Sequence, residues 1–207
     1  SRRTTWASTS NSCSPANQGR LRTMYKIGII GPESTGKTSL ARCLVMHLHG
    51  IYVPEYAREY MESLPSDYQY TYDDVFNIAY HQVKQMEAID YIYPRAHPVD
   101  IRDIHSPAAA PIYIFDTELI ITKVWFVHKY GKCPAFVEDA LHAHPMDYYV
   151  LCYPDIPWVY DPVRENPDLR EYLYDWYERE IKSLGVPYEV YRHTDSPLPS
   201  PIPETFR

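Results

Sequence analysis

The sequence has few cysteines and no long apolar run, and both shortages exclude classes of protein. Its four cysteines (Cys13, Cys43, Cys133 and Cys152) lie far apart and form no CxxC pair. That spacing argues against a zinc site or a disulfide framework and favours a reducing compartment. No apolar run approaches the roughly 20 residues that a membrane-spanning helix needs. We therefore expect a soluble, cytoplasmic protein that has no membrane partner.

Positive charge is also scarce, because 20 Lys and Arg stand against 27 Asp and Glu and give a net charge of −7. No basic stripe is present beyond the extreme N-terminus. Recognition of duplex nucleic acid depends on clustered Lys and Arg, so we expect no nucleic-acid partner. A small phosphate-bearing ligand needs only a local group of positive charges.

The 207 residues suit one domain with a substantial core. Residues 1–23 are rich in Ser, Thr, Asn and Arg, which favours a disordered leader over an organelle transit segment, because Met24 directly precedes the first expected strand. We place one domain at 24–192, with a Pro-rich insertion at 94–111 and a lid-like loop at 154–170. Residues 193–207 are expected to form a Pro-rich tail.

Strands and helices alternate along this domain. Short apolar runs predict strands at 25–30, 51–53, 112–115, 148–152 and 188–191. Apolar residues at helical spacing predict helices at 37–49, from 71 through 86, from 120 to near 131, at 135–142 and from 173 to 184. The pattern predicts an α/β protein with a three-layer P-loop NTPase fold, in which helices flank a five-stranded parallel sheet. Ligands of such folds bind at the carboxyl ends of the strands.

Residues 31–38 read Gly-Pro-Glu-Ser-Thr-Gly-Lys-Thr, which is a complete Walker A motif between an expected strand and an expected helix. The loop amides and the start of the helix can bind phosphate. Lys37 would bridge the β- and γ-phosphates of ATP, and the hydroxyl of Thr38 would bind Mg²⁺. The predicted nucleotide-binding residues are Gly31, Glu33, Ser34, Thr35, Gly36, Lys37, Thr38 and Ser39.

Two carboxylates follow neighbouring strands. Asp116 ends the third expected strand, where a Walker B carboxylate binds magnesium, although it could instead cap the next helix. Glu55 follows the second strand and is placed to act as a general base, although position alone leaves a solvated first-turn glutamate equally open. Arg58 could hold phosphate or Glu55, or pair with Glu62 at i, i+4.

The lid-like loop at 154–170 carries Arg164 and Arg170. Phosphoryl transfer gains most from cations placed where negative charge develops, and a closing lid also excludes water. We therefore predict a catalytic role for Arg164. For Arg170, a salt bridge to Glu165 or Asp168 is an equally open interpretation.

Several motifs resemble the ribosylnicotinamide kinase domain of NadR-type proteins over roughly residues 25–191. They read GPESTGKTSLA, VPEYAREY, IAYHQ, FDTELIITKVW, DIPWVYDPVRENPDLR and LGVPY. The resemblance implies a kinase that uses ATP and Mg²⁺ to phosphorylate the ribose 5′-hydroxyl of nicotinamide riboside, which gives nicotinamide mononucleotide for NAD synthesis. The second motif also resembles deoxynucleoside kinases, in which a glutamate at this position is the base. That likeness supports Glu55 as base and supplies another nucleoside or deoxynucleoside as the alternative substrate.

The sequence also departs from that family. NadR-type proteins often carry an adenylyltransferase domain with an HxGH motif, whereas residues 47–50 read His-Leu-His-Gly and lie in the first expected helix. Pro54 replaces an aromatic residue of some relatives. The nicotinamide ring, a flat cation, would favour an aromatic cage, with the candidates Tyr56, Tyr80, Trp125 and Trp158. The predicted substrate-binding residues are Glu55, Tyr56, Arg58, Asp116 and Trp158.

A function of a different class also fits the Walker A motif, namely a regulator that uses ATP as a switch for a protein partner. The base candidate and the arginine-bearing loop favour a kinase over this alternative. A homo-oligomer is compatible with the sequence.

Overall fold

The computed structural model describes residues 24–92, 111–162 and 164–194. The expected leader at 1–23, nearly all of the 94–111 insertion and most of the 193–207 tail lie outside the described residues. The strands are β1 (Tyr25–Ile30), β2 (Ile51–Val53), β3 (Ile112–Asp116), β4 (Tyr148–Cys152) and β5 (Tyr188–Tyr191). They form one parallel sheet in the order β2-β3-β1-β4-β5, which confirms the predicted fold class.

The helices are α1 (Lys37–Leu48), α2 (Tyr56–Ser63), α3 (Tyr72–Ile92), α4 (Leu119–Tyr130), α5 (Ala135–Ala143) and α6 (Arg170–Leu184). Five of them lie at the predicted positions, although α3 continues past the predicted residue 86 to Ile92. The sequence reasoning did not delimit α2, because this short helix buries none of its residues fully and so lacks a clear apolar stripe.

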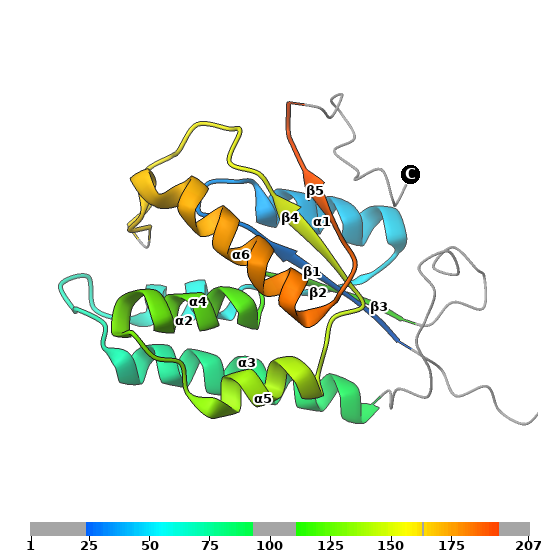
Figure 1. Cartoon of the computed structure of the whole chain (residues 1–207), viewed down its shortest axis with the longest axis horizontal. Coiled ribbons are helices and arrows are strands. Elements are labelled where there is room, and N and C mark those ends of the chain that lie inside the picture. The colour runs from blue at the N-terminus through cyan, green and yellow to red at the C-terminus, as the bar shows by residue number, and fades with distance from the viewer. Residues whose placement is uncertain (1–23, 93–110, 163, 195–207) are drawn as a thin grey trace, which may run out of the picture.

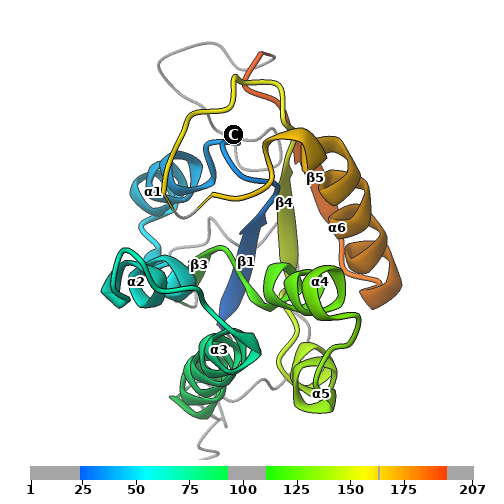
Figure 2. The same cartoon turned by 90° about the vertical axis from the view of Figure 1, so that its left-hand side faces the viewer.

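The helices cover both faces of the sheet (Figures 1 and 2). Helix α1 packs through Leu40 and Leu44 against one face, where Ile27 and Ile29 of β1 are fully buried. Helices α3, α4, α5 and α6 cover the opposite face in a larger apolar cluster. Because both faces are covered, the central strands read as continuous apolar runs rather than as alternating ones.

Three neighbouring strands, β2, β3 and β1, place their ends side by side. Ile29 of β1 is paired with Asp116 of β3, and Val53 of β2 is paired with Phe115 of β3. The loops that follow β2, β3 and β1 therefore meet at one edge of the sheet, as expected for parallel strands. Within the described part of the chain, no helix combines the length and apolar character that crossing a bilayer requires.

Candidate active site

A cavity of about 270 Å³ opens at the carboxyl ends of the strands. All eight predicted nucleotide-binding residues line it, together with Glu55, Arg58 and Arg164. Asp116 is only 1% exposed and lies directly before Thr117, which also lines the cavity. The fold therefore gathers most of the predicted site residues around one space.

The loop between β1 and α1 has a conformation that requires its glycines. Gly36 has φ 73° at the N-cap of α1, and a Cβ there would lie 2.3 Å from Nε2 of His193. Gly31 has φ 153°, and a Cβ there would lie 2.7 Å from the Cys152 carbonyl oxygen. Because a glycine N-cap offers no side chain to the first amides of α1, those amides remain available to an anion.

Lys37 and Thr38 begin α1 and line the cavity. The Lys37 ammonium donates a hydrogen bond of 2.8 Å to the Pro32 carbonyl oxygen, and the Thr35 hydroxyl donates to the same oxygen at 2.8 Å. Lys37 is thereby folded back over the loop, where a bound phosphate chain would also lie.

Glu55 is the residue before α2, and its side chain is 24% exposed. Burial raises the pKa of Glu55 above its usual value. The positive charge of Lys37 opposes that rise, the negative charge of Asp116 adds to it, and Arg58 opposes it from 3.5 Å. A partly buried carboxylate of raised pKa beside the phosphate loop is suited to accept a proton from a substrate hydroxyl.

Arg58 joins α2 to the lid-like loop. Its guanidinium lies 3.5 Å from Glu55, 3.3 Å from Glu62 and 3.0 Å from Asp161. The predicted pair with Glu62 is therefore present, and so is the predicted contact with Glu55. Because three carboxylates surround this one positive charge, they offset its attraction for a phosphate.

Asp116 ends β3 beneath the cavity. Its Oδ2 accepts a hydrogen bond of 2.7 Å from the Tyr52 hydroxyl, and burial together with Asp116 raises the pKa of Tyr52 to about 12. Its Oδ1 is buried and has no hydrogen bond within residues 24–92, 111–162 and 164–194. A buried carboxylate oxygen that lacks a partner is costly, and a cation would satisfy it.

Helix α4 is capped by Glu118, so the alternative role of Asp116 as its cap is wrong. The Glu118 Oε1 accepts a hydrogen bond of 3.1 Å from the Ile120 amide, whereas Asp116 remains inside the strand. The backbone turns sharply between them, because Thr117 has φ 71°. Burial raises the pKa of Glu118 to about 7, against the opposing effects of the Ile120 amide and Lys26.

A raised pKa makes Glu118 a source of pH-dependent stability. The folded protein holds this proton up to about pH 7 and the unfolded chain releases it near pH 4.5, so stability falls as pH rises through this range. We expect Glu118→Gln, which keeps an acceptor for Ile120, to remove this dependence. The melting temperature of the variant should gain on that of wild type between pH 5 and pH 8. A constant difference between the two proteins over this range would contradict the assignment.

The lid-like loop, which leaves β4 and returns at α6, rests on the phosphate loop (Figure 2). Arg164 donates hydrogen bonds of 2.8 Å to the Ser34 hydroxyl and 2.6 Å to the Val159 carbonyl oxygen. Arg170 donates to the carbonyl oxygens of Ser34 at 3.0 Å and Ile156 at 2.9 Å. These contacts take the place of the salt bridges to Glu165 or Asp168 that were the other interpretation.

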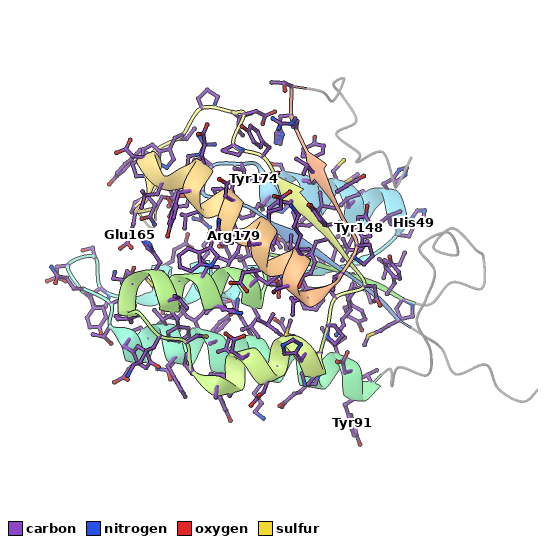
Figure 3. The ribbon with its side chains drawn as sticks, in the orientation of Figure 1. His49, Tyr91, Tyr148, Glu165, Tyr174 and Arg179 are labelled. Atoms are coloured by element: carbon purple, nitrogen blue, oxygen red, sulfur yellow. The ribbon has the colours of Figure 1, made fainter. Side chains whose placement is uncertain are left out.

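Glu33 fixes the second half of this loop. Its two carboxylate oxygens accept hydrogen bonds from the amides of Glu165 and Asn166 at 3.0 and 3.1 Å. The Glu165 side chain, at the end of the molecule between α6 and α4 (Figure 3), accepts a hydrogen bond of 2.5 Å from the Tyr70 hydroxyl. Lys129 lies 3.6 Å from the same carboxylate. A Walker A side chain therefore holds the lid-like loop directly.

Aromatic side chains form part of the cavity wall. Trp125, Tyr70, His128 and Tyr177 line it, and the Trp125 indole donates a hydrogen bond of 3.1 Å to the Tyr70 hydroxyl. The sequence reasoning named Trp125 but missed the other three. Tyr177 falls on the apolar stripe of α6, where it reads as a core residue, and Tyr70 falls between two elements.

The other three aromatic candidates lie elsewhere. Tyr56 stacks on His81 with 3.5 Å between the ring centroids, Tyr80 is 53% exposed on α3, and Trp158 packs edge-on against Tyr160. In the part of the chain that the structure describes, none of these three belongs to the cavity lining.

Comparison with known proteins identifies one matching family and several solved structures of similar fold. The sequence model of a family described as "AAA domain" matches residues 26–196. A crystal structure of NadR protein in complex with NAD and AMP-PNP is 21% identical with a TM-score of 0.62, over 86% of this chain and 46% of that chain. A second NadR structure, in complex with NR, is 20% identical with a TM-score of 0.58, over 81% and 44%. A thymidylate kinase from Ehrlichia chaffeensis is 12% identical with a TM-score of 0.50, over 88% and 93%.

The chain thus spans less than half the length of the two NadR structures that it matches. At 12–21% identity, these comparisons show a shared fold and nothing further. The residues that carry the chemistry must therefore be judged on their own geometry.

Proposed function

The chain belongs to the AAA domain family, and on that premise we propose that it is an ATP-dependent kinase whose acceptor is nicotinamide riboside. The observation that carries the proposal is the partly buried Glu55, which faces the Walker A loop across one cavity.

The residues around the cavity divide the work of phosphoryl transfer. Glu55 takes the proton of the acceptor hydroxyl, whose oxygen then bonds to the γ-phosphorus. The bond from that phosphorus to the β–γ bridging oxygen breaks, and ADP leaves. Lys37 and the loop amides hold the phosphates, and Arg164 moves from Ser34 to the charge that develops on the transferring group.

Magnesium fits the residues at this edge of the sheet. Thr38 lines the cavity, and Asp116 offers the buried Oδ1 that has no protein partner in the described ranges. The described residues contain no cluster of three or more His, Cys, Asp or Glu side chains that could bind a metal ion through protein ligands alone. That fits a Mg²⁺ ion held by one or two side chains plus phosphates, which would neutralise charge between the β- and γ-phosphates.

The aromatic lining of the cavity favours a nucleoside with a flat ring. Trp125 and Tyr177 supply aromatic surface, while Tyr70 and Glu165 are already engaged by Lys129, whose ammonium lies 3.6 Å from the Tyr70 ring centroid and 3.6 Å from the Glu165 carboxylate. A nucleoside monophosphate would bring a second phosphate to the cavity. The local cation, Arg58, is already shared among three carboxylates, which makes a phosphorylated acceptor less favourable.

The substrate assignment is tested with ATP, Mg²⁺ and a panel of acceptors at equal concentration: nicotinamide riboside, adenosine, deoxyadenosine, deoxycytidine, thymidine and thymidylate. We expect kcat/KM to be highest for nicotinamide riboside and the product to be nicotinamide mononucleotide. Phosphorylation of adenosine or a deoxynucleoside without phosphorylation of nicotinamide riboside would overturn the assignment and establish the alternative substrate.

Arg164 should matter for turnover more than for folding. We expect Arg164→Ala to lower kcat by about a hundredfold, because removal of one preorganised donor to developing charge typically costs that much. Arg179→Ala, on the exposed side of α6 (Figure 3), is the matched control and should leave kcat unchanged. Steady-state kinetics of the two variants check this, and equal turnover would remove Arg164 from the catalytic set.

A further inference from the structure

Thr117, the residue after β3, has a backbone conformation that its side chain disfavours. Its φ of 71° lies in the left-handed region, where β-branched residues are rare. The Thr117 amide donates a hydrogen bond of 3.0 Å to the Ile29 carbonyl oxygen of β1, which fixes this geometry. Glycine or asparagine would make the same turn with less strain.

The side chain of Thr117 adds a second cost. Thr117 is 6% exposed and lines the cavity, yet its hydroxyl has no hydrogen-bond partner among residues 24–92, 111–162 and 164–194. A buried hydroxyl without a partner destabilises the folded protein. Thr122 on α4 shows the ordinary arrangement, because its buried hydroxyl donates a hydrogen bond of 2.7 Å to Gln82.

The position of Thr117 in the sheet indicates what its hydroxyl could bind. Strand β3 lies between β2 and β1. Glu55 follows β2, Thr117 follows β3 and Gly31 follows β1, and all three line the cavity. Thr117 therefore stands between the candidate base and the phosphate loop, where the acceptor hydroxyl and the γ-phosphate must meet.

We propose that the Thr117 hydroxyl is a catalytic group that donates a hydrogen bond to an oxygen of the phosphoryl group as it passes to the acceptor. The inference rests on the proposed kinase function and adds a residue to it. The flanking Asp116 and Glu55 can only accept hydrogen bonds when ionised, so neither can serve a phosphoryl oxygen in this way. The strained backbone then holds the hydroxyl in place, and the transition state supplies the partner that this hydroxyl lacks in the free protein.

Three substitutions distinguish a catalytic hydroxyl from the alternative that Thr117 only occupies the turn after β3. Thr117→Ser keeps the hydroxyl, Thr117→Val keeps the shape without it, and Thr117→Gly removes both the hydroxyl and the strain. We expect kcat of the Ser variant to stay near wild type. The Val and Gly variants should lose about a hundredfold in kcat, with little change in the KM for ATP or in the KM for the acceptor. The reason is that the missing hydrogen bond forms in the transition state.

Thermal stability supplies a readout that does not depend on activity. The melting temperature of Thr117→Gly should rise, because the glycine relieves the strained φ and the buried hydroxyl is gone. Thr122→Val is the matched stability control and should melt lower, because it leaves Gln82 without its partner. A Gly variant that is both more stable and nearly inactive is the signature of the proposed role.

Two results would overturn the inference while leaving the kinase in place. One is wild-type turnover in Thr117→Val or Thr117→Gly, and the other is an equal loss in Thr117→Ser. Wild-type enzyme is assayed alongside with the full acceptor panel. If wild type phosphorylates no acceptor, the proposed kinase function fails instead. The melting temperatures of Thr117→Gly and wild type then show by themselves whether Thr117 lowers the stability of the folded protein.

Discussion

Replacement of Glu55 by glutamine should reduce kcat by about 10²- to 10⁴-fold, which is the range that a positioned general base contributes. The amide keeps the size of the side chain and its place before α2, but it cannot take the proton of the acceptor hydroxyl. Affinity for ATP should change little, because Glu55 lies between β2 and α2 rather than in the phosphate loop. Steady-state kinetics together with ATP titration separate the two effects.

The pH profile makes this test sharper. Because burial raises the pKa of Glu55 and only the ionised form is a base, kcat/KM of wild type should rise with pH through an apparent pKa above that of a free glutamate. Glu55→Gln should lack this acidic limb. Glu59→Gln, at an exposed position on α2, is the matched control and should keep both rate and profile. Equal losses of turnover and ATP affinity in Glu55→Gln would remove it from the base role.

Replacement of Lys37 by methionine should lower kcat by about 10²- to 10³-fold, since it removes a cation aimed at charge that develops on the phosphates. The unbranched methionine keeps the apolar stem at the start of α1, so the melting temperature should stay close to that of wild type. ATP binding should weaken as well, because Lys37 contacts the ground state too. Kinetics, calorimetric titration and thermal melts measure the three quantities.

A second consequence concerns Glu55. The charge of Lys37 holds down the pKa of Glu55, so the residual activity of Lys37→Met should have its acidic limb at a higher pH than wild type. Lys84→Met, on the exposed side of α3, is the control for loss of a lysine and should change neither rate nor profile. Turnover of Lys37→Met within twofold of wild type would contradict the assignment of the phosphate site.

The fold was accessible from the sequence because its signals are local. Strand β1 is a mostly apolar run, interrupted by Lys26, that ends at the Walker A loop, and α1 carries Leu40, Leu44 and Leu48 at helical spacing. Such patterns depend on a few neighbouring residues. The bounds of helix α2 were not predicted, because this helix lies on the surface and buries none of its residues fully.

The site was accessible only in part, for a related reason. Lys37 and Asp116 are marked by the elements beside them, whereas the aromatic wall is assembled from residues far apart in the chain. Tyr70 meets Trp125 and Glu165 only through the packing of α4 and the lid-like loop. No spacing in the sequence distinguishes Tyr177, which lines the cavity, from an ordinary core residue of α6.

The same limit applies to Ser34 and Glu33. Both were assigned to nucleotide binding from the Walker A motif, and both line the cavity. Their side chains, however, hold Arg164 and the amides of the lid-like loop. A motif specifies how its backbone meets a phosphate, but its variable side chains take partners that only the tertiary structure provides.

The central claim, transfer of a phosphoryl group to a nucleoside rather than to water, is tested most directly by stoichiometry. Wild-type protein is incubated with ATP and Mg²⁺, with and without nicotinamide riboside, and ADP, inorganic phosphate and phosphorylated nucleoside are quantified together. We predict ADP and nicotinamide mononucleotide in a one-to-one ratio, with little inorganic phosphate and little ADP when the acceptor is omitted. ADP release matched by inorganic phosphate, and unchanged by any nucleoside, would contradict the claim and indicate an ATP-hydrolysing switch.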